Sequence, residues 1–249
     1  MERLRFKLLS LLTQIYKIML AIVTGASKGI GYELARELIT KHKCTVIAAS
    51  RNISPLILLK KQKEYRDLFP VQADISTTVG RKKVLLAVLA ADKKVDILFN
   101  NAGELVNKPF EKISEKELQS VYNTNVFSPF LLTQKLLTHF NKKGAHIVNI
   151  GSMGGFQGSS KFPGLSAYSS SKAALSGLSE CMAVELSDKK IKVNCLALGA
   201  VQTEMLGRAF PGYKAPLTAK QMAEYVSWFG VHGQEFHNGK VIAVSLSTP

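Results

Sequence analysis

The sequence predicts an α/β fold, a Rossmann-type doubly wound parallel sheet of seven strands with helices on both faces. Three observations predict this fold. Short apolar runs alternate with stretches of helical periodicity from end to end. The 249 residues, of which 46% are hydrophobic, are enough to bury one large core. No linker, internal repeat or low-complexity tract divides the chain, so we expect a single domain.

Each strand is predicted where a short apolar run is bounded by polar or turn residues. These runs cover residues 20–24, 44–49, 70–73, 95–100, 145–151, 191–198 and 240–245. The connections between them carry helical periodicity, over residues 29–41, 53–68, 77–91, 114–140, 166–187 and 218–230. Ligands bind at the carboxyl ends of the strands in such sheets, so functional residues are expected where the apolar runs end.

Residues 1–18 (MERLRFKLLSLLTQIYKI) form a basic, amphipathic extension before the predicted domain at 19–249. Their apolar part is too short and too interrupted for a transmembrane span, and no small-residue cleavage site follows it. Two interpretations remain open. The segment is an interfacial helix on a membrane, or it results from an upstream start codon, with Met19 as the biological start. We favour the second, and membrane association is not expected.

The net charge of +15 raises the question of a nucleic-acid partner. The cations form short clusters, most of them at the ends of predicted helices, where they complement the helix dipole. No cluster is interleaved with aromatic residues as a base-stacking platform requires. We therefore expect a solvated basic surface that attracts anionic cofactors or acidic substrates, and no nucleic-acid partner.

The three cysteines, Cys44, Cys181 and Cys195, are widely spaced and lie in apolar surroundings. They show neither the spacing of a metal site nor a disulfide framework, so no metal is expected. Such sparse cysteines are typical of a reducing compartment, which predicts a cytoplasmic protein.

A glycine motif, T-G-A-S-K-G-I-G at residues 24–31, lies between the first predicted strand and the first predicted helix. Glycines let the backbone approach a phosphate closely, and the free N–H groups of a helix N-terminus favour negative charge. A strand, a glycine turn and a helix start in this order predict a pyrophosphate cradle.

A tyrosine and a lysine, Tyr168 and Lys172, begin the predicted helix 166–187 with a spacing of four residues. On a helix this spacing places both side chains on one face, a turn apart. A nearby ammonium favours the phenolate and lowers the phenol pKa, so the pair predicts a tyrosine that acts as an acid or base.

Further polar residues follow other strands. Asn100-Asn101-Ala102-Gly103 ends the strand at 95–100, Ser152 follows the strand at 145–151, and Asn125 interrupts the apolar stripe of the helix at 114–140. Together with the glycine motif and Tyr168–Lys172, this set resembles the short-chain dehydrogenase/reductase family from Leu20 onward. Within the family the chain looks most like 3-oxoacyl-(acyl-carrier-protein) reductases and general ketoreductases.

The resemblance implies roles for these residues. Tyr168 would donate a proton to the substrate carbonyl, Lys172 would tune it and bind the nicotinamide ribose, Ser152 would hold the carbonyl oxygen, and Asn125 would support a water relay. The implied cofactor-binding residues are Thr24, Gly25, Ser27, Lys28, Gly29, Ile30, Gly31, Ser50, Arg51, Asn52, Asp74, Ile75, Asn101, Ala102, Gly103, Tyr168, Lys172 and Thr203. The family also implies a homo-oligomer, a dimer or tetramer, through the long helix 114–140.

The residues after the second strand predict which cofactor binds. An NAD site needs a carboxylate there to hold the ribose hydroxyls, but residues 48–52 read A-A-S-R-N. Arg51 instead offers a planar cation for a 2′-phosphate, and Lys28 adds a second charge. We therefore expect NADP(H).

The sequence departs from the family pattern near the substrate. Leu198 stands where the usual proline is expected, and residues 156–164 lengthen the segment between Ser152 and Tyr168. Ser159 or Ser160 is the alternative hydroxyl if Ser152 does not act. Met205, Leu206, Phe210 and Tyr213 follow Thr203 and form either a lid over a partly hydrophobic substrate or the ordinary packing of a flap.

These features predict an NADPH-dependent oxidoreductase that reduces a ketone or aldehyde, including a 3-oxoacyl thioester, by hydride transfer. The alternative is a protein of the same fold that binds NADP(H) but is catalytically silent and serves a regulatory or interaction role. The intact serine, tyrosine and lysine favour the enzyme.

Overall fold

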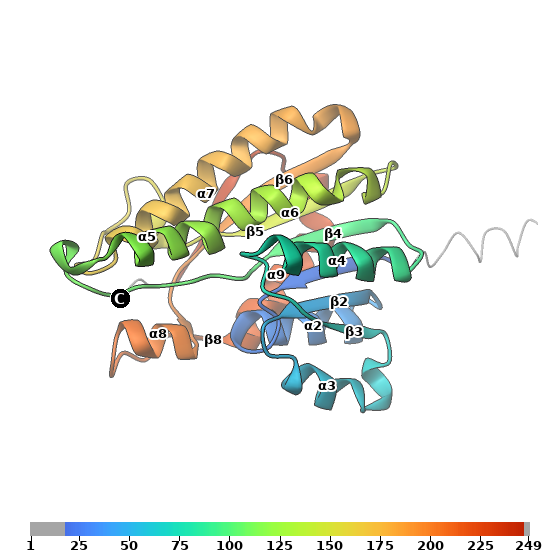
Figure 1. Cartoon of the computed structure of the whole chain (residues 1–249), viewed down its shortest axis with the longest axis horizontal. Helices are drawn as coiled ribbons and strands as arrows, with labels where there is room; N and C mark the ends of the chain where they lie inside the picture. Colours follow the sequence, from blue (N-terminus) through green and yellow to red (C-terminus); the bar gives the residue numbers. More distant parts are fainter. Residues whose placement is uncertain (1–17, 247–249) are drawn as a thin grey trace, which may run out of the picture.

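The computed structural model describes residues 18–246, which form a seven-stranded parallel sheet in the order β3-β2-β1-β4-β5-β6-β9 (Figure 1). The strands are β1 (Leu20–Thr24), β2 (Thr45–Ser50), β3 (Leu68–Gln72), β4 (Val95–Asn100), β5 (Ala145–Ile150), β6 (Ile191–Leu198) and β9 (Val241–Val244). β1, β4 and β5 are buried along their whole length, as apolar strands covered on both faces should be. The predicted doubly wound fold is confirmed.

The helices cover both faces of the sheet and divide the core into two layers. They are α2 (Gly29–Thr40), α3 (Ser54–Lys60), α4 (Thr78–Ala90), α5 (Glu115–Tyr122), α6 (Ser128–Leu136), α7 (Ser166–Glu185), α8 (Glu204–Ala209) and α9 (Ala219–His232). One core layer joins the sheet to α2, α3 and α9, and the other joins it to α4, α6 and α7. β1 and β4 lie next to each other in the middle of the sheet. The chain adds β2 and β3 on one side of this pair and β5, β6 and β9 on the other, so the strand order reverses between β1 and β4. Ligands bind outside the strand ends at such a switch point.

The helix predicted over residues 114–140 is not continuous. A π-helical turn, Asn123–Phe127, separates α5 from α6, and a 3₁₀ turn, Leu137–His139, follows α6. The π turn is held by the Ser128 hydroxyl, which donates to the Asn123 carbonyl at 2.6 Å and contacts the Ile75 carbonyl at 3.0 Å. The break places Asn125, which is fully buried, on the inner side of the turn.

The helix predicted over residues 53–68 is also too long, because α3 ends at Lys60 and a separate 3₁₀ turn covers Lys63–Tyr65. Tyr65 is buried, and its hydroxyl accepts a hydrogen bond from Arg36 on α2 at 3.2 Å. β3 begins at Leu68 rather than at residue 70. None of the helices within residues 18–246 combines the length and apolar character needed to cross a membrane.

Candidate active site

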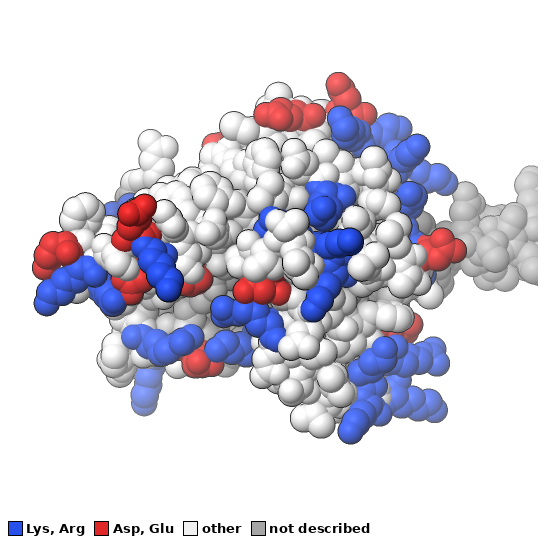
Figure 2. Space-filling view, in the orientation of Figure 1, with Lys and Arg blue, Asp and Glu red and all other residues white. Residues whose placement is uncertain are grey.

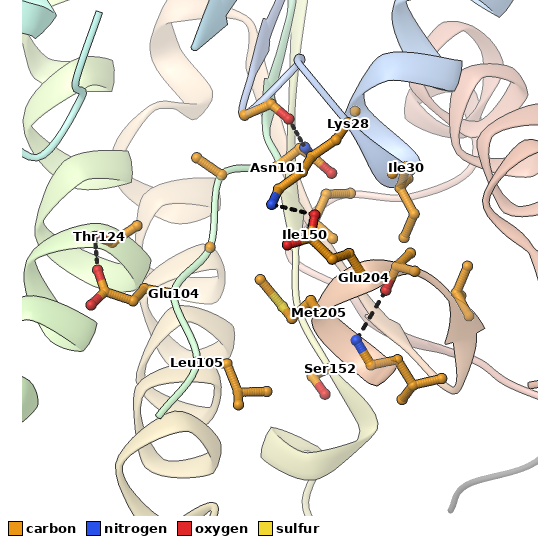
Figure 3. A pocket seen from close by; sticks show the side chains of 18 of the residues that line it. Lys28, Ile30, Asn101, Glu104, Leu105, Thr124, Ile150, Ser152, Glu204 and Met205 are labelled. Atoms are coloured by element: carbon orange, nitrogen blue, oxygen red, sulfur yellow. Dashed lines mark hydrogen bonds and ion pairs between the residues drawn. The ribbon is translucent and has the colours of Figure 1, made fainter. Parts of the chain in front are cut away.

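A cavity of about 660 Å³ opens at the carboxyl edge of the sheet, where the loops after β1, β2, β4, β5 and β6 meet (Figure 3). Nearly every residue predicted to bind the cofactor or to act in catalysis lines it. Thr24 and Asn125 are the exceptions, since both are fully buried behind the lining. The glycine motif and the Tyr168–Lys172 pair, more than 130 residues apart in the sequence, are therefore brought to one site.

The glycine motif wraps tightly around the start of α2. Gly25 and Gly29 have φ angles of +67° and +56°, which favour glycine. Gly31 is required for a different reason, because a Cβ there would lie 2.3 Å from the Asn101 amide nitrogen and 2.5 Å from the Gly25 carbonyl oxygen. Lys28, the N-cap of α2, provides no side-chain cap, so the first N–H groups of the helix face the cavity without that partner. This geometry suits a phosphate group.

The N-N-A-G segment after β4 is fixed to the glycine motif through Thr24. The Thr24 hydroxyl accepts hydrogen bonds from the backbone N–H groups of Asn101 and Ala102, at 3.0 and 3.1 Å. In return, the Asn101 amide donates to the Thr24 carbonyl at 2.9 Å. Thr24 and Asn101 therefore hold the ends of β1 and β4 together at this side of the cavity.

The polar end of the cavity contains the residues that are predicted to determine whether NADP(H) or NAD(H) binds. Ser50, at the end of β2, donates to Ser27 at 2.8 Å, and Arg51 next to it is exposed. Lys28 forms an ion pair of 2.6 Å with Glu204, at the start of α8, which was not expected (Figure 3). Asp74 is partly engaged, because its Oδ1 accepts from the backbone and hydroxyl of Ser76.

Tyr168 and Lys172 lie on the first turns of α7, and both line the cavity. The Lys172 ammonium lies 5.8 Å from the centroid of the Tyr168 ring and donates to the Ile150 carbonyl at 2.7 Å. Burial lowers the pKa of Lys172 to about 8. Burial also raises the pKa of Tyr168, with partial compensation from its hydrogen bond with Ser152. The net direction is therefore opposite to the predicted lowering, because desolvation of the phenol is the largest cause.

Ser152, not its alternatives, faces the cavity. Its hydroxyl caps the 3₁₀ turn Met153–Gly155 by accepting from the Gly154 N–H at 3.2 Å, and it lies close enough to Tyr168 to lower the pKa of that phenol. Ser159 instead donates to the carbonyls of Met153 and Phe156, and Ser160 is exposed. The extra residues 156–164 thus form a wall segment stabilised by its own hydrogen bonds.

Asn125 is held by a residue that sequence reasoning missed, Glu104. The Asn125 amide donates to the Glu104 carbonyl and to Ser171, both at 2.9 Å, and accepts from the Glu104 N–H at 2.8 Å. The Glu104 carboxylate accepts from the hydroxyls of Ser120 and Thr124, at 2.8 and 3.1 Å. The one signal for Glu104 in the sequence is an acid directly after N-N-A-G.

The segment after β6 covers the cavity. Leu198 lines the site in place of the expected proline, and Thr203 caps α8 by accepting from the Leu206 N–H at 3.2 Å. Met205, Leu206 and Phe210 line the cavity together with Leu105 of the opposite loop, whereas Tyr213 does not. Asn107 donates to the Ala209 carbonyl at 2.7 Å, and the rings of Phe162 and Phe210 meet edge to face at 5.5 Å.

Comparison with known proteins agrees with this geometry. A family model for short chain dehydrogenases matches residues 19–214. Acetoacetyl-CoA reductase from Acinetobacter sp. is 34% identical over 193 residues, which cover 75% of each chain. The 3-oxoacyl-[acyl-carrier-protein] reductase FabG of Buchnera aphidicola is 30% identical over 210 residues, covering 84% of this chain and 80% of that protein.

Solved structures give the same result at the level of the fold. The 3-ketoacyl-(acyl-carrier-protein) reductase from Brucella melitensis, complexed with NADH, superposes with a TM-score of 0.81 at 26% identity and covers 91% of this chain and 96% of that one. The structure described as ElxO with NADP bound has a TM-score of 0.80 at 25% identity and covers 92% and 97% of the two chains. The chain belongs to the short-chain dehydrogenase family.

Proposed function

We propose that this protein is an NADPH-dependent reductase that converts a ketone or aldehyde, with an apolar substituent or an acyl thioester, to the alcohol. The observation that carries the proposal is the placement of Tyr168, Lys172 and Ser152 in one cavity with the uncapped N-terminus of α2. The first three supply proton chemistry, and the helix N-terminus supplies an anion site.

The cavity fits a dinucleotide. Gly25, Gly29 and Gly31 leave no side chain between the backbone and a pyrophosphate, and Gly31 could not carry one. Ser50 and Arg51 lie beside the glycine motif, where an adenosine ribose would bind, and Asp74 is the acceptor for the adenine amine. When bound, the nicotinamide supplies the hydride for the reduction.

The residues of this chain then supply orientation and the proton. Ser152 and Tyr168 both line the cavity and lie close enough for Ser152 to lower the Tyr168 pKa, so both hydroxyls can reach a single carbonyl oxygen. Tyr168 donates its proton to that oxygen as negative charge develops there. Lys172 binds the nicotinamide ribose hydroxyls, and Asn125 keeps the neighbouring α5–α6 turn in place through Glu104 and Ser171.

The preference for NADPH over NADH is supported by charge. Residues 48–52 contain no acid to hold ribose hydroxyls, and Arg51 is exposed, with no salt bridge to any carboxylate among residues 18–246. Its guanidinium is therefore available to a 2′-phosphate. Lys28 forms an ion pair with Glu204, so Arg51 is the main residue that determines the preference for NADPH over NADH.

The substrate end of the cavity is apolar. Leu105, Met153, Phe162, Leu206 and Phe210 line it. This lining favours a ketone with a hydrocarbon substituent, such as a 3-oxoacyl thioester, over a polyhydroxylated sugar. The edge-to-face contact of Phe162 with Phe210 joins the wall segment to α8, which supports the lid interpretation.

We also propose a homo-oligomer, a dimer or tetramer, in the cytoplasm. Leu118, Phe127 and Phe130 leave 41%, 50% and 46% of their surface exposed on α5, the π turn and α6. Val184 on the neighbouring α7 is 79% exposed. Apolar side chains exposed together are typical of a surface that a partner covers.

The test is a titration with NADPH and NADH, followed by turnover on ketones that include acetoacetyl thioesters. We expect tighter NADPH binding and turnover, and Arg51→Ala should weaken NADPH at least tenfold while leaving NADH unchanged, because only NADPH carries the phosphate. Tyr168→Phe should lower turnover by a factor of about 10² or more and leave the NADPH affinity intact. NADPH binding without turnover on any ketone would instead favour the catalytically silent protein.

A further inference from the structure

An acidic residue, Glu204, reaches across the cavity to the glycine motif. Its Oε2 accepts a hydrogen bond from the Lys28 ammonium at 2.6 Å (Figure 3). The two residues begin different elements, since Lys28 is the N-cap of α2 and Glu204 is the first residue of α8. Both line the cavity. The ion pair therefore joins the segment that is proposed to bind the pyrophosphate to the segment that covers the cavity.

Glu204 is held beside the glycine motif by its own segment. Its second carboxylate oxygen, Oε1, lies 3.5 Å from the guanidinium of Arg208, one turn further along α8. Thr203, the residue before it, packs against the glycine motif, since a Cβ built at Gly29 would lie 3.5 Å from the Thr203 methyl carbon. Figure 2 shows Lys and Arg side chains beside an acidic side chain over α8, at the lower left of the view. The carboxylate of Glu204 is therefore positioned before any cofactor binds.

Lys28 lies at the end of the cavity where the adenosine ribose is proposed to bind. The residue before it, Ser27, accepts a hydrogen bond from Ser50 at 2.8 Å, and Ser50 directly precedes Arg51. Lys28 and Arg51 therefore flank this end with two cations. Within residues 18–246, only Lys28 of these two has a carboxylate partner. Glu204 thus neutralises one of the two cations that a 2′-phosphate would meet.

The Lys28–Glu204 ion pair is weak enough to exchange with a phosphate. Its two side chains are 60% and 58% exposed, so water screens their attraction. The hydrogen bond from Lys28, above all, lowers the pKa of Glu204, so the carboxylate is charged at neutral pH. A phosphate group carries more negative charge than a carboxylate and has three acceptor oxygens. It can therefore compete for Lys28, but the exchange leaves the Glu204 charge behind as a repulsive neighbour.

We infer that Glu204 is a positioning residue that holds the Lys28 ammonium away from the 2′-phosphate of NADPH and thereby weakens NADPH binding. The inference rests on the proposed function, in which NADPH is the cofactor. The effect is specific to NADPH, because NADH carries no 2′-phosphate. Weaker binding favours release of the oxidised cofactor after each turnover, a step that limits the rate of many enzymes.

The test is the affinity of Glu204→Gln for NADPH and NADH, measured by cofactor fluorescence. The amide keeps the size of the side chain and removes its charge. We expect NADPH to bind about three- to tenfold more tightly and NADH to change by less than about twofold, since a charged hydrogen bond to the 2′-phosphate becomes available. The gain should decrease as salt is raised, because the groups are exposed.

A double-mutant cycle shows whether Glu204 acts through Lys28. In a Lys28→Ala background, Glu204→Gln should change the NADPH affinity by less than about twofold. The matched control is Glu235→Gln, which makes the same change in net charge at an exposed carboxylate outside the cavity and should bind NADPH as the unchanged chain does. Circular dichroism melting curves establish that all variants fold.

Unchanged or weaker NADPH binding by Glu204→Gln would overturn the inference, because an ion pair that only holds α8 over the cavity gives no gain when it is lost. A gain that is equal for NADH, or that persists in Lys28→Ala, would also overturn it. None of these results affects the proposed function while the unchanged chain binds NADPH and reduces a ketone. A chain that binds neither cofactor would overturn both.

Discussion

The buried histidine His146 should make the protein lose stability below about pH 6.5. His146 lies on β5 with no exposed surface. Its Nδ1 faces the Gly230 carbonyl at 2.9 Å and its Nε2 faces the Asn194 amide nitrogen at 3.0 Å. The carbonyl can only accept and the amide nitrogen can only donate, which assigns the proton to Nδ1 of a neutral ring. A second proton would face a donor.

The size of the effect follows from the pKa. Burial, above all, lowers the pKa of His146 from 6.5 to about 4. Because the unfolded chain binds the proton more readily, the stabilising contribution is fully present above pH 6.5 and is lost as the pH falls toward 4. The complete loss is about 3 kcal/mol in the free energy of unfolding, and about 2 kcal/mol is lost between pH 7.5 and pH 5.

The assay is urea denaturation of the unchanged chain and of His146→Gln at pH 7.5 and pH 5. The glutamine variant is expected to be less stable at pH 7.5, because its amide replaces a fitted ring, but it cannot titrate. The unchanged chain should therefore lose about 2 kcal/mol more than the variant over this pH range. Equal losses in the two proteins would refute the assignment of a neutral, buried ring.

Three further predictions concern the cavity. Gly31→Ala should weaken NADPH at least tenfold by fluorescence titration, because the new Cβ would lie 2.3 Å from an amide nitrogen, whereas Gly177→Ala, in open space, should have no effect. The NADPH affinity should fall above about pH 8, where Lys172 loses the proton with which it binds the ribose, and an affinity unchanged up to pH 9.5 would contradict this role. Glu104→Ala should lower kcat several-fold with little change in KM, and Glu104→Gln should restore it, because an amide can still bond Ser120 and Thr124.

The sequence predicted the sheet and most of the cavity because both depend on local patterns. Apolar runs, a glycine turn and a four-residue spacing are each read within one element. The Lys28–Glu204 pair joins residues 176 positions apart, and no local pattern indicates it. The π turn at Asn123–Phe127 escaped prediction for the same reason, because the contact of Ser128 with Ile75 comes from the loop after β3.

The pKa of Tyr168 shows a second kind of limit. The spacing of Tyr168 and Lys172 places a cation near a phenol, and that much was correct. The sign of the shift depends on how much water the fold removes from the phenol, and the loops that remove it come from distant segments such as 198–210. A motif therefore predicts which charges meet but not the environment in which they meet.

The two edges of the sheet have opposite electrostatic character, and this allows the influence of the distant basic surface on cofactor binding to be tested. Helix N-termini point toward the carboxyl edge, where they favour the phosphates of a cofactor, and helix C-termini point toward the amino edge, where they tolerate lysines. A strand of five or six residues separates the edges by about 17–20 Å, which is twice the screening length at physiological salt. Reversing the charge of the exposed lysines Lys142, Lys143, Lys189 and Lys190 at the amino edge should therefore leave the NADPH affinity unchanged. A large fall in that affinity would mean that the cofactor responds to the basic surface as a whole, and not to Arg51 and the glycine motif.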